Sequence, residues 1–133
     1  MSTIKKIKVF TSDDRGEITD IFTHEPKDHC TIVTFKKNAV RGNHFHKVSV
    51  QSAYVLEGNF EIHNVMIDND LNFDPKKIEI IKTSKGDYIT HEKFEAHTYK
   101  CISETGSLMV FTKGVRGGKF YEDDTYRLKE KLI

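Results

Sequence analysis

The sequence predicts an all-β fold, arranged as a closed or two-sheet antiparallel barrel, and three observations support this prediction. Short apolar stretches rich in β-branched and aromatic residues recur along the chain, turn residues separate them, and no segment keeps a helical period. A barrel is expected because its closure covers the edges of many short strands. A chain of 133 residues suits one hydrophobic core, so we expect a single domain over residues 1–133.

The first half of the chain contains five predicted strands. The first of them, within "TIKKIKVF", places lysines among β-branched residues, which is typical of a strand at a sheet edge. The turn sequences "DDRG" at 13–16 and "EGN" at 57–59 mark the start of the second strand and the end of the fifth. The predicted strands are 4–10, 16–22, 30–36, 43–48 and 50–57.

The second half contains five more predicted strands. The polar loop 68–76, which includes Pro75, separates the two halves of the barrel. The sequences "SKGD" at 84–87 and "SETGS" at 103–107 favour turns. We expect a rim loop or a subunit contact at 113–126 and a last helical turn or a frayed end at 128–133. The predicted strands are 59–67, 77–82, 86–90, 95–102 and 107–113.

Composition excludes several classes of partner. Lys and Arg number 21 against 20 Asp and Glu, and the formal charge of +1 provides no basic field for nucleic acid. Cys30 and Cys101 form no C-x-x-C pair, so we expect reduced thiols. No apolar run approaches the roughly 18 residues that cross a bilayer, and no secretory segment begins the chain. We therefore expect a soluble, cytoplasmic protein that binds neither nucleic acid nor membrane.

Histidines on two predicted strands are the main candidates for chemistry. Alternate residues of a strand face the same side, so His44 and His46 project together and Phe45 points away. The same alternation places Glu95, His97, Tyr99 and Cys101 on one face, which we expect to be the inner one. We treat the other histidines as structural or surface residues; they are His24, His29, His63 and His91.

The two histidine-bearing stretches resemble the two motifs of the cupin superfamily. "GNHFHKVSVQSAYVLEG" is similar to the first motif, in which Gly and His-x-His precede a Glu and a second Gly, except that Gln51 stands at the Glu position. "GDYITHEKFEAHTYKC" is similar to the second motif, with Gly86 and His97 at its glycine and histidine positions. The resemblance covers about residues 5–113 and implies a single-domain cupin jelly-roll barrel, also called a double-stranded β-helix.

The cupin resemblance also implies a candidate metal site inside the barrel. Its ligands would be three imidazoles and one amide oxygen, from His44, His46, His97 and Gln51. Neutral imidazole suits iron, nickel, copper and zinc, whereas an amide is a weaker ligand than a carboxylate and adds no negative charge. A divalent metal is therefore one alternative for this chain, and a site of neutral histidines without metal is the other.

A narrower resemblance points to enzymes that act on nucleotide sugars. The stretches "RGEITDIF" at 15–22 and "VRGNHFH" at 40–46 are similar to segments of dTDP-4-keto-6-deoxyglucose 3,4-ketoisomerases and, more distantly, of dTDP-4-dehydrorhamnose 3,5-epimerases. The closing "YEDDTYRL" at 121–128 is similar to the acidic and aromatic end of the ketoisomerases. This resemblance implies a cytoplasmic homodimer that acts on a dTDP-linked deoxysugar, in deoxysugar or surface-polysaccharide biosynthesis.

Proton transfer beside a ketone needs a base, a donor to the enediol oxygen and a cation for the phosphates. Histidine takes and returns protons near neutral pH, so we assign His44 and His46 as catalytic residues. Tyr99 is the candidate donor, because a phenol can donate a hydrogen bond to an enolate oxygen. The candidate substrate-binding residues are Arg41, Arg15, Glu95, His97 and Gln51, with the two arginines assigned to phosphate.

Three hypotheses remain open at this stage. The preferred one is an isomerase, a ketoisomerase or epimerase of nucleotide sugars, which requires no cofactor. The second is a metal-dependent, dioxygenase-like cupin enzyme that uses three histidines. The third is a non-catalytic cupin that binds sugar. Fold alone does not choose among them, because one fold hosts many activities.

Overall fold

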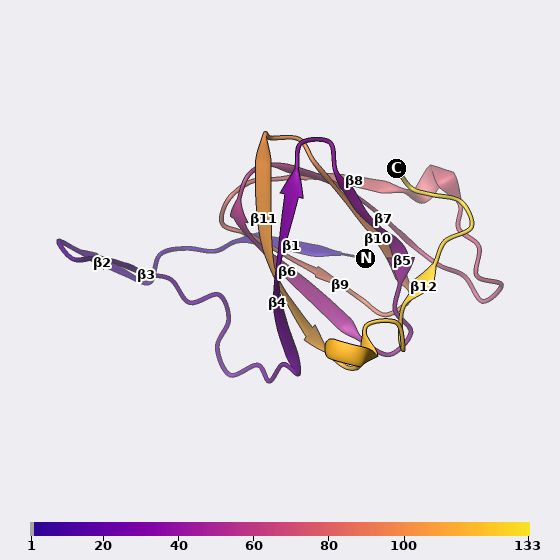
Figure 1. The fold of residues 1–133 in the computed structure, drawn as a ribbon, viewed down its shortest axis with the longest axis horizontal. Helices are drawn as coiled ribbons and strands as arrows, with labels where there is room; N and C mark the ends of the chain where they lie inside the picture. Colours follow the sequence, from indigo (N-terminus) through magenta and orange to yellow (C-terminus); the bar gives the residue numbers. More distant parts are fainter. Residues whose placement is uncertain (1) are drawn as a thin grey trace.

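Two five-stranded antiparallel sheets face each other in the computed structural model, which describes residues 2–133 (Figure 1). The first sheet contains, in spatial order, β1 (Thr3–Lys6), β9 (Asp87–His91), β6 (Val50–Glu57), β11 (Thr105–Lys113) and β4 (His29–Lys36). The second contains β12 (Tyr126–Arg127), β5 (Val40–Phe45), β10 (Glu95–Cys101), β7 (Phe60–Met66) and β8 (Glu79–Thr83). The predicted all-β, two-sheet barrel is confirmed.

The chain crosses from one sheet to the other at nearly every connection after β4. The exception is the pair β7 and β8, which are neighbours in the second sheet and are joined by the predicted polar loop with a short 3₁₀ turn, η1 (Pro75–Lys77). Because consecutive strands line opposite walls, inward side chains from distant parts of the sequence meet between the sheets. This topology brings the two histidine-bearing stretches together.

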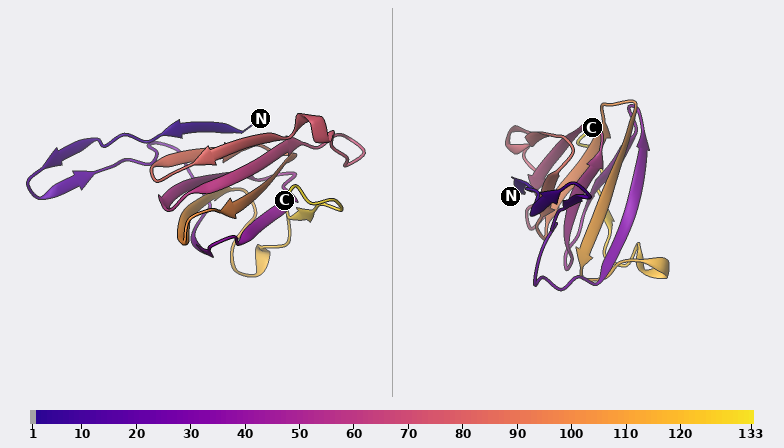
Figure 2. Two further views of the ribbon diagram at one scale, coloured as in Figure 1. Left: turned by 90° about the horizontal axis from the view of Figure 1, so that it is seen from above. Right: turned by 90° about the vertical axis from the view of Figure 1, so that its left-hand side faces the viewer.

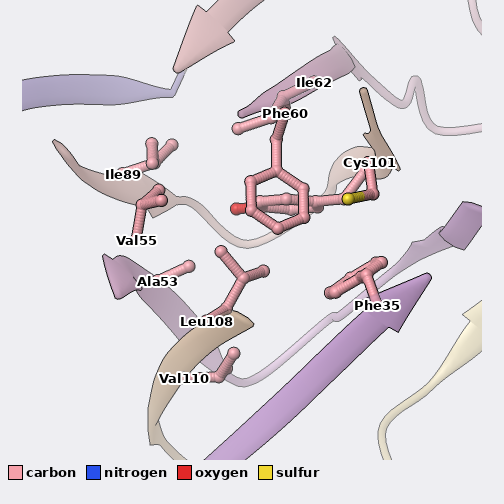
Figure 3. Packing of buried hydrophobic residues seen from close by; sticks show 10 residues of the cluster. Phe35, Ala53, Val55, Phe60, Ile62, Ile89, Cys101, Leu108 and Val110 are labelled. Atoms are coloured by element: carbon pink, nitrogen blue, oxygen red, sulfur yellow. The ribbon is translucent and has the colours of Figure 1, made fainter. Parts of the chain in front are cut away.

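The space between the sheets is filled mainly by apolar side chains (Figure 3). Phe60 lies at its centre, fully buried, with its ring 4.9 Å from that of Phe35. Gly106 passes directly beside this ring, and a Cβ there would lie 2.6 Å from the Phe60 ring. The core consists of Phe35, Ala53, Val55, Phe60, Ile62, Ile89, Tyr99, Cys101, Leu108 and Val110.

A two-stranded hairpin extends away from the barrel (Figures 1 and 2). It is formed by β2 (Thr11–Asp13) and β3 (Gly16–Ile18), whose residues are all exposed. The sequence predicted one strand over 16–22, but only its first three residues are a strand, because their partner is the adjacent β2 and not the barrel. The predicted first strand is likewise shorter than expected and ends at Lys6.

The C-terminal residues pack against the second sheet. The strand β12, which was not predicted, pairs with the end of β5. Beyond it, Leu132 is buried beside Phe45 and Val65, and the side-chain oxygen of Asn43 accepts a hydrogen bond from the Leu132 amide at 2.7 Å. The prediction of a last helical turn or a frayed end is therefore wrong, because this apolar side chain completes a second core cluster.

Two further predictions concern the environment of the protein. Both cysteines are free thiols, with Cys30 exposed and Cys101 buried, as expected. Over residues 2–133, none of the helical segments has the length and apolar character that membrane crossing requires.

Candidate functional site

A pocket of about 460 Å³ lies between the two sheets and contains most of the predicted site residues. Inward side chains of β4, β5, β6, β10 and β11 form its walls, and side chains from residues 114–127 complete them. The apolar floor belongs to the core described above. The polar or charged side chains of the lining are Thr31, Arg41, His44, Gln51, His97, Tyr99, Arg116, Tyr121 and Arg127.

Three histidines meet at this pocket. His44 of β5 lies directly opposite His97 of β10 in the strand register, and His46 follows the end of β5. One nitrogen of each ring lies within 4.8 Å of the others. The ring centroid of His44 is 5.0 Å from that of His46 and 4.9 Å from that of His97. His44 and His97 line the pocket and His46 lies behind them, and His46 and His97 are each only 2% exposed.

Backbone carbonyls fix the orientation of the two buried rings. Nδ1 of His46 lies 2.7 Å from the carbonyl oxygen of Asp124, and Nδ1 of His97 lies 3.1 Å from that of Glu95. A carbonyl oxygen only accepts, so each Nδ1 carries the proton and each Nε2 presents a lone pair. Nε2 of His46 is buried and has no hydrogen-bond partner among the described residues. The cluster therefore presents unprotonated nitrogens, which can accept protons.

Gln51 joins this cluster from the opposite sheet. The end of its side chain lies 3.1 Å from Nε2 of His97. Since that nitrogen accepts, the amide of Gln51 donates to it through its NH₂ group, an orientation inferred from the hydrogen bonding. Gln51 thus donates a hydrogen bond to the lone pair of His97 Nε2. Because the amide is neutral, this contact adds no charge to the cluster.

Burial keeps the histidines of this cluster uncharged. Desolvation, followed by the charges of His46, Arg116 and Arg127, lowers the pKa of His44 to about 3. Desolvation also lowers the pKa of His46, against the opposing effect of its hydrogen bond to Asp124, and holds the pKa of His97 well below its usual range. All three imidazoles are therefore neutral at pH 7.

These lowered values predict acid sensitivity of the fold. In the unfolded chain His44 titrates near its usual pKa of about 6.5, so between that pH and about 3 the unfolded state binds more protons. Stability is then fully present above pH 6.5 and is lost as the pH falls. His44 alone is expected to lower the free energy of unfolding by up to about 2 kcal/mol between pH 7 and pH 5. Urea denaturation at both pH values measures this.

The control for this acid sensitivity is the variant His44→Gln, which cannot titrate. Its loss of stability between pH 7 and pH 5 should be smaller than that of the wild type by the amount assigned to His44. Equal losses in the two proteins would show that His44 is not held neutral by the fold.

The same three histidines fit a divalent metal. Nε2 of His46 is unpartnered, one nitrogen of each of the three rings lies within 4.8 Å of the others, and backbone carbonyls orient two of the rings as is usual in metal sites. His44, His46 and His97 would hold the ion, and Gln51 would be a neutral fourth ligand if its amide turned so that Oε1, in place of the NH₂ group, faced the ion. An ion bound there would supply a Lewis acid for a substrate oxygen.

Tyr99 is connected to a histidine that the sequence analysis left out. Nε2 of His91 lies 2.5 Å from the Tyr99 hydroxyl, and the His91 ring stacks on His97 at 4.3 Å with an angle of 7°. Desolvation, together with the charge of Glu95, raises the pKa of Tyr99, so its phenol stays protonated. His91 is 1% exposed and holds a proton donor of the pocket. Ile89 and His91 are two residues apart on β9 and both are buried, so strand alternation from an inward Ile89 predicts an inward His91.

Glu95 lies behind this pair rather than in the pocket. Its Oε1 accepts a hydrogen bond from the Ser2 hydroxyl at 2.8 Å, and that hydroxyl lies 2.7 Å from Nδ1 of His91. Burial alone would raise the pKa of Glu95, but hydrogen bonds with His91 and Ser2 leave it below its usual value. Glu95 therefore orients His91 and does not line the pocket, although the sequence assigned it to substrate binding.

The arginines divide into two groups. Arg41 lines the pocket, as predicted, with its guanidinium 5.5 Å from the centre of the Phe35 ring. Arg15 lies in the β2–β3 hairpin and pairs with Asp13 at 2.7 Å, so the structure does not bring it to the pocket of its own chain. Arg116 and Arg127 also line the pocket, although no sequence motif indicates them.

Gly42 gives β5 the shape that the cluster needs. It lies at φ +123° beside the register shift between His97 and Thr98 of β10. A Cβ at this position would lie 2.5 Å from the His97 carbonyl oxygen and 2.8 Å from the Thr98 Cα. Only glycine fits both the backbone angle and the close approach.

Comparison with solved structures identifies the fold. No protein-family model matches the chain, and no curated protein matches it. The QdtA sugar 3,4-ketoisomerase from Thermoanaerobacterium thermosaccharolyticum, in complex with TDP, is similar with a TM-score of 0.75 and 19% identity over 96% of this chain and 88% of that chain. A 3,4-ketoisomerase from Helicobacter canadensis gives 0.72 and 17% over 96% and 90%.

An epimerase shares the same architecture. The dTDP-4-dehydrorhamnose 3,5-epimerase from Elizabethkingia anophelis NUHP1 gives a TM-score of 0.72 and 16% identity over 90% of this chain and 72% of that chain. The predicted jelly-roll barrel fold is therefore confirmed. At such low identities the similarity establishes the fold, and the activity has to be argued from the site.

Proposed function

We propose that the protein is an isomerase of nucleotide sugars, which moves a proton beside the keto group of a dTDP-linked deoxysugar. The observation that carries this proposal is the composition of the pocket. Neutral imidazoles and a protonated phenol line it together with Arg41, Arg116 and Arg127. A base, a proton donor and a set of phosphate-binding cations thus occupy one cavity, as the reaction requires.

His44 is the base in this proposal, because it is the histidine of the His-x-His pair that lines the pocket. It removes the proton from the carbon next to the ketone, and the electron pair moves to the keto oxygen. That oxygen accepts a hydrogen bond from the Tyr99 hydroxyl once the hydroxyl turns from Nε2 of His91 to the substrate. Return of a proton to the same carbon from the other face gives an epimer. For migration of the ketone, the carbon that loses its proton carries a hydroxyl group: the enediol is protonated at the former keto carbon, the neighbouring hydroxyl gives up its proton, and its oxygen becomes the new keto oxygen.

Substrate binding makes His44 a better base. After burial and the charge of His46, the charges of Arg116 and Arg127 contribute to its low pKa of about 3. A diphosphate bound to these arginines neutralises them and removes their share of the effect that lowers the pKa of His44, while the effect of burial stays. His46, which lies behind His44, supplies a second neutral imidazole for proton exchange.

Structural similarity supports this substrate class. The QdtA structures are complexes with TDP and, for one variant, with TDP-4-keto-6-deoxyglucose. We therefore propose TDP-4-keto-6-deoxyglucose as the first substrate to test. A cytoplasmic role in deoxysugar or surface-polysaccharide biosynthesis accords with this choice.

The experiment is solvent exchange followed by NMR. The protein is incubated with TDP-4-keto-6-deoxyglucose in D₂O, with and without EDTA, and deuterium is expected on the carbon next to the keto group in both samples. Lack of exchange would contradict the proposal. If the protein binds TDP-4-keto-6-deoxyglucose but no deuterium is incorporated, a non-catalytic sugar-binding cupin would be favoured instead.

The metal-dependent alternative is favoured by one observation, the buried and unpartnered Nε2 of His46 among three converging histidines. The EDTA sample decides between the two functions. Activity that disappears with the chelator and returns with one particular divalent metal would establish the metalloenzyme.

We also propose that the protein is a homodimer. Soluble monomers seldom expose large apolar side chains side by side, yet in and next to the β2–β3 hairpin Phe10 is 72% exposed and Ile18 is 58% exposed. The hairpin projects too far to be covered by its own barrel, and a second copy would cover it (Figure 2). Light scattering is expected to give twice the chain mass of 15.4 kDa. A mass of one chain at micromolar concentration would contradict the dimer.

A further inference from the structure

The segment of residues 114–127, here called the mouth segment, is anchored at both ends beside the pocket. Its first residues are held by two hydrogen bonds, from the Gly114 amide to Asp28 and from the Val115 amide to the Ser49 hydroxyl. Near its other end, the buried carboxylate of Asp124 accepts hydrogen bonds from the backbone amides of residues 47–49. The part of the mouth segment between these anchors includes the turn η2 (Gly118–Phe120). Its side chains are consequently held next to the pocket.

Two arginines of the mouth segment, Arg116 and Arg127, line the pocket, and Arg116 has no ion-pair partner among the described residues. Arg116 is half-buried, and burial lowers its pKa. Both of its hydrogen bonds, to the Tyr121 carbonyl at 3.1 Å and to the Thr125 hydroxyl at 2.9 Å, use Nη1. In the described part of the chain no carboxylate forms an ion pair with Arg116. Nη2 and Nε are therefore left to donate to a ligand.

Arg127 already holds an anion of its own chain. It lies directly opposite His44 in the register between β12 and β5. Its two terminal nitrogens donate to the two carboxylate oxygens of Glu122 at 2.6 and 2.9 Å. This bidentate geometry is the one in which a guanidinium also binds phosphate.

Another anion can easily displace Glu122 from its ion pair with Arg127. The side chains of Glu122 and Arg127 are 65% and 64% exposed, and exposed ion pairs contribute little to stability. A phosphate carries more charge than a carboxylate and would interact with Arg116 and Arg41 as well, which line the same pocket. An incoming phosphate is consequently favoured over Glu122.

Tyr121 adds an aromatic surface to this side of the pocket. The guanidinium of Arg116 lies 5.0 Å from the centre of its ring, and the ring of His29 meets it edge-on at 5.5 Å. These contacts fix the orientation of a partly exposed ring in the pocket lining. A flat heterocycle can stack on such a ring.

We propose that Arg116 and Arg127, together with Arg41, form the diphosphate-binding part of the pocket, and that Glu122 occupies Arg127 until a diphosphate displaces it. Glu122 is then a built-in competitor, which sets the affinity for nucleoside diphosphates and rejects weaker anions. The inference rests on the proposed function in one respect, that the ligand carries a diphosphate.

Calorimetric titration with TDP and, separately, with inorganic pyrophosphate tests the proposal. Glu122→Gln removes the competing charge and is expected to tighten binding of both probes by about three- to fivefold, the range that an exposed ion pair allows. The matched control is Glu104→Gln, which breaks the exposed pair of Glu104 with Lys37 outside the pocket and should leave the affinity unchanged.

The arginines are tested in the same way. The positive charge is kept in Arg116→Lys and Arg127→Lys, but the planar guanidinium that donates two parallel hydrogen bonds is lost. Each substitution is expected to weaken binding of TDP by about tenfold. Circular dichroism and thermal denaturation confirm that these variants fold. Thymidine, which has no phosphate, should bind equally to the wild type and to Glu122→Gln.

The outcomes separate this inference from the proposed function. If Glu122→Gln binds TDP no more tightly than the wild type, or if both lysine variants keep full affinity, the inference is wrong. Lack of binding of both TDP and pyrophosphate to the wild type would also overturn it. If the affinities change as expected but no deuterium exchange occurs, the diphosphate site stands and the isomerase proposal fails.

Discussion

Replacing His44 with alanine is expected to lower turnover of TDP-4-keto-6-deoxyglucose by on the order of a hundredfold or more, because general bases typically contribute that much. His44 lines the pocket, and burial keeps it in the neutral form that accepts a proton. His46→Ala is expected to act similarly, since it removes the neutral imidazole 5.0 Å behind His44. Steady-state kinetics measure both effects.

The double variant and a control variant determine how the losses of turnover in His44→Ala and His46→Ala are interpreted. A double variant no worse than either single variant would show that the two histidines act as one unit. His63→Ala is the matched control, because His63 pairs with Glu61 and lies outside the pocket lining. Circular dichroism must show that the barrel persists. Full activity in both single variants would remove His44 and His46 from the mechanism.

Gly42→Ala is expected to cost about 2–6 kcal/mol of stability and to abolish activity. The new Cβ would lie 2.5 Å from the His97 carbonyl oxygen and 2.8 Å from the Thr98 Cα, which are backbone atoms that cannot turn aside. A positive φ and an overpacked contact each cost about 1–3 kcal/mol. Relief requires β5 to move away from β10, which separates His44 from His97.

Gly16→Ala isolates the steric part of this effect. Gly16 also has a positive φ, of +134°, but nothing lies within 4 Å of the position of its Cβ. Its substitution therefore adds strain without a clash and leaves the histidine cluster in place. Urea denaturation of both variants should show the larger loss for Gly42→Ala, and equal losses would show that the approach of β5 to β10 is not tight.

The parts of the site that follow strand alternation could be predicted from the sequence. Gln51, His97 and Tyr99 all line the pocket because alternation fixes which side chains point inward. His91 obeys the same rule but was set aside, because it lies between the family motif positions instead of on them. The fold was predictable for a similar reason, since β-branched runs and turn residues are local signals.

The contribution of the mouth segment could not be predicted in this way. Arg116 and Arg127 lie in a stretch without regular periodicity, and they reach the pocket only because Asp124 is hydrogen-bonded to amides about 76 residues earlier in the chain. Such long-range contacts leave no periodic pattern in the sequence. The predicted strand 16–22 is longer than the observed β3 because β3 pairs with its neighbour β2 and not with the barrel.

Asp124 also determines when the site becomes competent during synthesis of the chain. Its carbonyl holds Nδ1 of His46 and its carboxylate binds the amides of Lys47 and Ser49, across separations of 75 to 78 residues. Ribosomes deliver the N-terminal strands first, and contacts between distant residues close late in folding. A nascent chain that stops before residue 124 can pair β4 to β11 yet leaves the His46 imidazole without its orienting partner. The orientation of the His46 ring is therefore acquired last, after most of the barrel has been translated.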